Sequence, residues 1–156
     1  MRIFISYTVV FFFFTLTYAQ DSKEFDLVIV IDDELVIAPE GFTIRLESFK
    51  DSLSFTPIYH PGSLELTKWQ YDKLYSEEFT TMKIIFSYNL KYKKRAKHYF
   101  YEINFIKEWL EYPFTILRIY NLDKGKYRRK YAPVDKDSNF SKVLDFGYYQ
   151  IKKLKN

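Results

Sequence analysis

Two neighbouring runs of alternating residues constrain the fold of this sequence more than any other feature. Residues 83–92 carry apolar side chains at every second position, and residues 98–105 resume the alternation after a basic turn. A period of two residues is typical of half-buried antiparallel strands, so 83–106 is predicted to form a hairpin. Pairing Tyr92 with Tyr99 places every apolar residue opposite another, whereas a shift of one residue would put the two apolar rows on opposite faces. The further pairs predicted in this way are Leu90 with Tyr101, Tyr88 with Ile103 and Phe86 with Phe105.

Shorter runs of the same kind follow one another along the rest of the chain. Turn signals such as Asp32-Asp33, Pro61-Gly62 and Asp123-Lys124-Gly125 separate them, and Gly125 is free to take a positive φ. Many short strands without an internal repeat predict a mainly β protein, an antiparallel β-sandwich. The further strands are predicted at 25–31, 34–37, 42–47, 52–57, 64–66, 114–121, 126–131, 143–146 and 148–154.

One segment departs from the period of two. Thr67-Lys68-Trp69-Gln70 fits a capping box, in which the Thr67 hydroxyl and the Gln70 side chain each bond the backbone N–H of the other. One short helix is therefore predicted near 67–76. The succession of an early hairpin, a single helix and a later meander looks like immunoglobulin-like or prealbumin-like sandwiches, a likeness of architecture that implies no activity.

The first nineteen residues have the pattern of a secretory signal. Arg2 precedes an apolar and aromatic run at 3–18, and Thr17-Tyr18-Ala19 offers small residues at the cleavage positions. We expect a signal peptide at 1–19, cleavage after Ala19, and one β-sandwich domain at 20–156 that is secreted or periplasmic and has no membrane span. The alternative is an uncleaved anchor, although the run is shorter than the roughly 20 residues that span a bilayer.

The sequence contains no cysteine. An exported domain without disulfides depends on its core, and a chain of this length can bury roughly two thirds of its unfolded surface. The absence of cysteine fits a bacterial periplasm or exterior better than an animal extracellular space.

Charge is divided unequally along the chain. Residues 21–78 contain 13 acidic and 5 basic side chains, whereas residues 79–156 contain 7 acidic and 18 basic ones. Two outcomes are open: a molecule that is bipolar in space, or two halves that interleave and give a mixed surface.

Basic residues cluster at two predicted hairpin turns. If both turns project from the same end of the molecule, they form one patch, with tyrosines nearby, that suits an anionic polysaccharide or an acidic protein. Because the chain is expected to be exported, no nucleic-acid partner is predicted. The alternative is that lysine-rich turns keep sheet edges soluble and prevent edge-to-edge pairing. The candidate residues are Lys93, Lys94, Arg95, Lys97, Lys124, Lys126, Arg128, Arg129 and Lys130.

No catalytic, metal or cofactor motif stands out. The four glycines are isolated, so no phosphate-binding loop is predicted, and the two histidines, His60 and His98, have no zinc spacing. Both histidines are explained by turn or surface positions. Calcium ligands are conceivable at 32–34 and at Asp135 and Asp137, but neither has the EF-hand spacing, and acidic turn residues explain both.

Three functional hypotheses remain. The first is an exported, non-enzymatic β-sandwich domain that serves as a binding module. The second is a domain that binds polyanions or carbohydrate through the basic turns, although an aromatic core explains the many tyrosines without a sugar ligand. The third is a small exported hydrolase.

Overall fold

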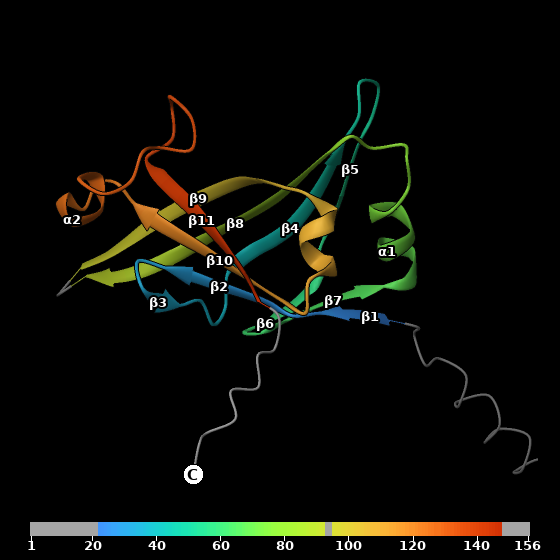
Figure 1. Ribbon diagram of the computed structural model, residues 1–156, viewed down its shortest axis with the longest axis horizontal. Coiled ribbons are helices and arrows are strands. Elements are labelled where there is room, and N and C mark those ends of the chain that lie inside the picture. The colour runs from blue at the N-terminus through green and yellow to red at the C-terminus, as the bar shows by residue number, and fades with distance from the viewer. Residues whose placement is uncertain (1–21, 93–94, 148–156) are drawn as a thin grey trace, which may run out of the picture.

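The computed structural model describes residues 22–92 and 95–147, without the side chains at positions 91, 92 and 95. The predicted signal peptide, its cleavage after Ala19 and the predicted strand 148–154 lie outside these ranges and stay predictions. Within them the chain is a mainly β protein with sheets packed as a sandwich, as the sequence predicts. Figure 1 shows the strands crossing at the centre, with α1 (Lys68–Leu74) at one end and α2 (Gly125–Arg128) at the other.

One layer contains the predicted central hairpin. Its strand order is β5 (Ser52–Phe55), β4 (Glu40–Glu47), β8 (Thr81–Tyr92) and β9 (Arg95–Phe105), all antiparallel neighbours.

The predicted faces of this hairpin are confirmed, but the predicted register is wrong. Tyr88, not Tyr92, lies opposite Tyr99, and Phe86 lies opposite Tyr101. The pairing is displaced by an even number of residues, which keeps both apolar rows on the same face. Alternation therefore determines the face of each strand but not the length of the turn between them.

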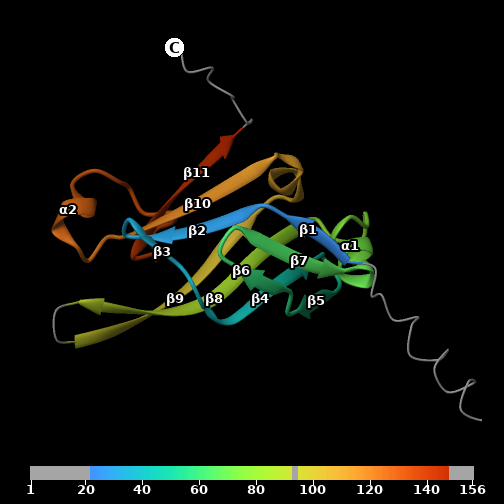
Figure 2. The ribbon, with the colours of Figure 1, turned by 90° about the horizontal axis from the view of Figure 1, so that it is seen from below.

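The second layer brings together strands from the two ends of the chain. Its order is β11 (Phe140–Gly147), β10 (Phe114–Asn121), β2 (Leu27–Ile31) and β3 (Glu34–Leu35). β10 pairs with β2 in parallel, which differs from the wholly antiparallel arrangement that was predicted. Figure 2 shows β2, β10 and β11 in one layer above β4, β8 and β9 in the other.

The turn between β2 and β3 is tight and left-handed. Asp32 and Asp33 both have positive φ (54° and 71°), the backbone conformation of a type I′ turn. Aspartate tolerates this region better than most residues because its short side chain bonds locally. The predicted Asp32-Asp33 hairpin turn is confirmed.

A third, smaller sheet continues from the second. β1 (Ser22–Phe25) precedes β2 directly but pairs with β7 (Ser63–Thr67), which in turn pairs with β6 (Ile58–His60). The N-terminal strand therefore changes sheets near Asp26. The predicted helix 67–76 is confirmed as α1, with both capping-box bonds between Thr67 and Gln70 present.

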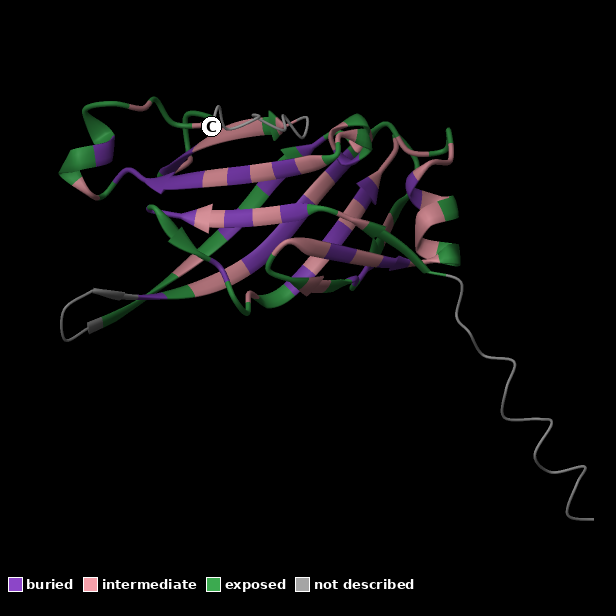
Figure 3. Ribbon diagram, turned by 60° about the horizontal axis from the view of Figure 1, so that its bottom comes forward, coloured by how far each residue is buried: buried purple, intermediate pink, exposed green. Residues whose placement is uncertain are grey.

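The core lies between the layers. Alternate residues of the central strands are buried, which Figure 3 shows as purple bands. Phe86 and Tyr101 pack with ring centroids 5.2 Å apart, and Phe105 packs edge-on against Trp109 of the 3-10 helix η1 (Lys107–Glu111). The fully buried side chains include Leu27, Ile29, Ile31, Ile44, Leu64, Leu66, Ile84, Ile103, Leu117 and Ile119. This aromatic and aliphatic core replaces the disulfides that the chain lacks.

The strand predicted at 126–131 is wrong. The chain forms the single helical turn α2 there, and Gly125 begins that turn without taking a positive φ. Tyr127 and Tyr131 lie four residues apart, a spacing that fits either a strand face or one helical turn. Both rings pack against Tyr120 of β10, Tyr131 with a centroid distance of 4.2 Å and nearly parallel planes, so tertiary packing favours the helix.

Candidate functional site

The parallel strands β2 and β10 end at the same edge of their sheet, and polar residues follow both. Asp32 and Asp33 come directly after β2, while Asn121 closes β10 and leads through Asp123 into α2. The far end of the β8–β9 hairpin lies at the same end of the molecule (Figure 1, left). We call this region, residues 32–33, 97–99 and 121–131, the α2 end.

Asp32 is the buried centre of the α2 end. Its side chain is 1% exposed and accepts hydrogen bonds from the Asn121 backbone N–H (2.8 Å) and the Asn121 side-chain amide (2.7 Å). The Lys124 ammonium lies 2.8 Å from the same carboxylate. The amide oxygen of Asn121 in turn accepts from the Tyr101 hydroxyl at 3.0 Å. A buried charge that is paired and fully hydrogen-bonded is stable there, so this network ties β2, β9 and β10 together.

Two further carboxylates, those of Asp33 and Asp123, lie nearer the surface than Asp32. The Tyr127 hydroxyl (2.8 Å) and the Lys126 ammonium (3.1 Å) donate to Asp33, and these bonds hold the pKa of Asp33 below its usual value.

Asp123 receives hydrogen bonds from Lys97 and from the Tyr99 hydroxyl. Burial alone would raise the pKa of Asp123, but these bonds outweigh burial and lower it. Asp123 therefore links β9 to the chain that leads into α2.

A hollow of about 570 Å³ lies between the β8–β9 hairpin and α2. Lys97, Lys124 and Lys126 line it, together with Tyr99 and Tyr127. The structure thus brings lysines from both predicted basic turns to one hollow, although the second turn is a helix and not a hairpin. Each of the three lysines is bound to a carboxylate.

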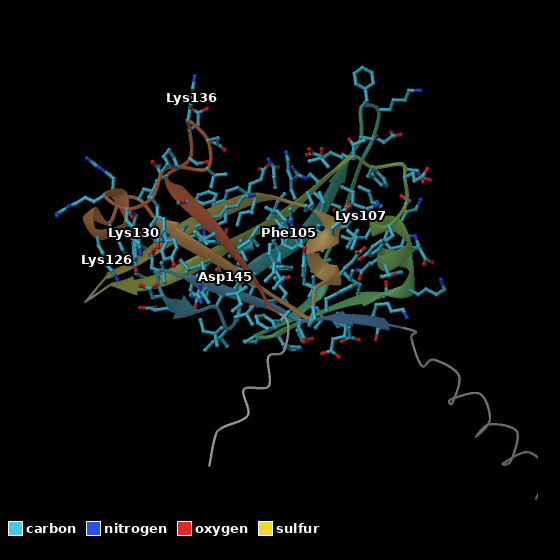
Figure 4. All side chains as sticks on the ribbon, viewed as in Figure 1. Phe105, Lys107, Lys126, Lys130, Lys136 and Asp145 are labelled. Carbon is cyan, nitrogen blue, oxygen red and sulfur yellow. The ribbon has the colours of Figure 1, made fainter. Side chains whose placement is uncertain are left out.

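The outer side of α2 adds cations that are not neutralised. Arg128, Arg129 and Lys130 are exposed, and among the described residues no carboxylate lies within ion-pair distance of them. The Lys130 ammonium lies over the Tyr131 ring, 5.1 Å from its centroid. Figure 4 labels Lys126 and Lys130 at the α2 end, where the Lys126 ammonium reaches back to Asp33 at the end of β2. The α2 end therefore presents six cations against three carboxylates.

The predicted site residues divide into three groups. Lys93 and Lys94 lie outside the described residues, as does the side chain of Arg95. Three lysines serve in ion pairs around the hollow, namely Lys97, Lys124 and Lys126. The remaining cations, Arg128, Arg129 and Lys130, form the exposed surface of the helical turn.

The sequence prediction missed the anionic half of the α2 end. The sequence pattern identifies Asp32 and Asp33 as turn residues and as remote calcium candidates, and Asn121 as the end of a strand. The structure pairs both aspartates with lysines from the basic half of the chain. Lys83 likewise contacts Glu47 across β8 and β4. The two halves therefore interleave at these contacts, the second of the two charge layouts left open.

The described part of the chain offers less support for a catalytic histidine or a metal site. His60 is exposed, and exposed His98 lies 3.0 Å from the Asn89 side-chain oxygen rather than beside an acid. No group of three or more metal-ligating side chains occurs within the described ranges, and no helix there is long and apolar enough to cross a membrane. Comparison with protein-family models, curated proteins and solved structures finds no match to this chain.

Proposed function

We propose that this chain is an exported, non-enzymatic β-sandwich domain that binds anionic polysaccharide at the α2 end. The observation that carries the proposal is the excess of cations there: three lysines around one hollow, beside three exposed cations without carboxylate partners. Clustered cations of one sign raise the local concentration of a polyanion and hold it by several contacts at once.

The geometry favours a chain of repeated anionic groups over a single small anion. Lys126 lines the hollow and the exposed Arg128 belongs to the same helical turn, so a polymer that follows the turn meets both sets of cations. Arginine contributes bidentate hydrogen bonds to sulfate or carboxylate groups, and Arg128 and Arg129 are both exposed.

The buried aromatic residues favour this proposal over a sugar platform. Tyr101, Tyr120 and Tyr127 are buried, and they pack against one another or against the core. Trp69 is exposed but lies on α1, at the opposite end from the lysine-lined hollow. The aromatic residues therefore serve mainly as core, and the cations remain the distinctive surface.

Retention on immobilised heparin tests the proposal. The variant Arg128→Gln/Arg129→Gln/Lys130→Gln should elute at clearly lower salt than the unaltered chain, because polyanion affinity falls steeply with salt in proportion to the number of ion contacts. The control Lys23→Gln/Lys50→Gln/Lys68→Gln removes the same charge from exposed positions elsewhere and should elute with the unaltered chain.

Equal elution of the two triple variants would show that retention reflects net charge alone and would overturn the proposal. Preference for polyglutamate over heparin in a competition assay would replace the polysaccharide with an acidic protein as the partner. A thermal unfolding curve for each variant confirms that the fold is retained.

A further inference from the structure

β9 presents an open edge over most of its length. It is the last strand of its sheet, and β8 uses only one of its two sides. The Lys142 ammonium of β11 donates to the Asn104 carbonyl at 2.5 Å, so that carbonyl points away from β8. Main-chain groups of alternate residues in an antiparallel strand point the same way, so Glu102 and Phe100 also direct theirs to the open side. Within residues 22–92 and 95–147, no other main chain hydrogen bonds to these outward groups.

A groove of about 740 Å³ follows this edge. One wall is β9 from Lys97 to Glu102, and the opposite wall is the segment 135–140. That segment is held in place, since the Leu122 N–H donates to the Asn139 carbonyl at 2.8 Å and Asp135 accepts from the Ser138 hydroxyl at 2.7 Å. The edge therefore faces a formed groove and not open solvent.

The groove differs in charge from the lysine-lined hollow next to it. Its carboxylates are Glu102, Asp123, Asp135 and Asp137. Its two lysines, Lys83 and Lys97, pair with Glu102 and Asp123, which leaves Asp135 and Asp137 without an ion pair among the described residues. The groove therefore favours a ligand with positive charge.

We propose that β9 binds an extended peptide segment rich in basic residues by strand addition along the groove. Main-chain bonds to the outward groups of Phe100 and Glu102 supply affinity, and Asp135 and Asp137 select lysine or arginine in the peptide. Phe100, 59% exposed, offers an apolar contact between them. This site adjoins the polysaccharide surface proposed above, since Lys97, Tyr99 and Asp123 line both the groove and the hollow, but it takes a ligand of opposite charge.

The surroundings of the edge favour a single segment over a second copy of this chain. Lys142 occupies the outward carbonyl of Asn104 and so ends the available edge there. Because the 135–140 segment walls the groove opposite the strand, one extended chain fits beside β9 more readily than the edge of a whole second sheet. An inward-reaching lysine of this kind is a common protection against edge-to-edge pairing.

The probe is a fluorescein-labelled nine-residue peptide of alternating lysine and valine, titrated in a fluorescence anisotropy assay. Phe100→Pro removes the ring and the outward N–H, whereas Phe100→Ser removes only the ring. Proline is tolerated on an edge strand where its missing N–H would point to solvent. We expect Phe100→Pro to bind about tenfold more weakly than Phe100→Ser, the effect of one lost main-chain hydrogen bond.

A second measurement does not depend on any variant. In the unaltered chain, hydrogen exchange at the Phe100 and Glu102 amides should slow on addition of the peptide. The same peptide N-methylated at alternate amides should neither bind nor protect, and Asp137→Lys should weaken binding several-fold at low salt.

Three results would overturn the proposal. These are equal binding of Phe100→Pro and Phe100→Ser, equal binding of the N-methylated peptide, and protection of the two amides that rises with protein concentration when no peptide is present. The last result would assign the edge to a second copy of the chain.

Discussion

Replacing Asp32 with asparagine should destabilise the fold far more than the same change at its neighbour Asp33. Asparagine has the same shape and tolerates positive φ, so the turn itself is preserved. In Asp32→Asn one carboxylate oxygen becomes an NH₂ group that faces two donors, the Asn121 amide at 2.7 Å and the Lys124 ammonium at 2.8 Å. Two charge-assisted hydrogen bonds are lost in a site where the carboxylate is 1% exposed.

The expected cost follows from the surroundings of each partner. Breaking a buried ion pair costs about 3–5 kcal/mol when the remaining charge stays buried. Lys124 is 29% exposed and can turn partly toward water, so we expect about 3 kcal/mol, which lowers Tm by roughly 10 °C in a domain of this size. Urea unfolding should show a lower midpoint with an unchanged slope.

Asp33→Asn is the matched control, because it lies in the same turn, also at positive φ, but has a side chain that is 54% exposed. An exposed pair contributes about 0–1 kcal/mol, so its midpoint should change little. If Asp32→Asn costs no more than Asp33→Asn, the buried network does not stabilise the α2 end and our reasoning is refuted.

Two further perturbations probe other parts of the structure. A Cβ added at Gly147 would overlap the Phe114 ring across the β10–β11 pair, so Gly147→Ala should lower Tm. Gly125→Ala meets open space at the start of α2 and should raise the free energy of unfolding by about 0.5 kcal/mol. Equal shifts of Tm in the two variants would contradict this. The pKa values of Asp33 and Asp123 are lower in the folded chain than in the unfolded chain, where they are about 4. Both carboxylates therefore stabilise the fold above that pH, and this stabilisation is lost as the pH falls through their folded pKa values. Urea midpoints should therefore be steady near neutral pH and fall below about pH 4, with a smaller fall in Asp33→Asn/Asp123→Asn; an identical fall in that variant would assign acid sensitivity to other groups.

Local pattern predicted most of the fold, because the face of a strand depends only on alternation. The capping box predicted α1 because it too is a local signal: its two hydrogen bonds lie within four residues. The register of the central hairpin failed because any even shift keeps its apolar rows together. The pair Tyr127 and Tyr131 was ambiguous between a strand and a helical turn, and contact with Tyr120 decided it.

The α2 end was predicted only in part, because its pairing is not local. The sequence identified the basic residues by their density, but their partners Asp32 and Asp33 come from the other half of the chain. The parallel pairing of β2 with β10 brings them together, and only one signal hinted at it. Both faces of 27–31 are apolar, which is typical of an inner strand of a parallel sheet.

The parallel pairing of β2 with β10 also bears on the order in which the chain can fold. Contacts between β8 and β9 close a short loop, whereas pairing Leu27 with Thr115 closes a loop that contains most of the domain. Closing a long loop costs more chain entropy than closing a short one, so the pairing of β2 with β10 forms slowly. During synthesis the apolar segment Leu27–Ile31 emerges with its short neighbour β3 but well before β10, and until β10 arrives the side of β2 that pairs with β10 is an unpaired strand edge of the kind that aggregates. For this chain, the most hazardous period is therefore the interval between making β2 and making β10.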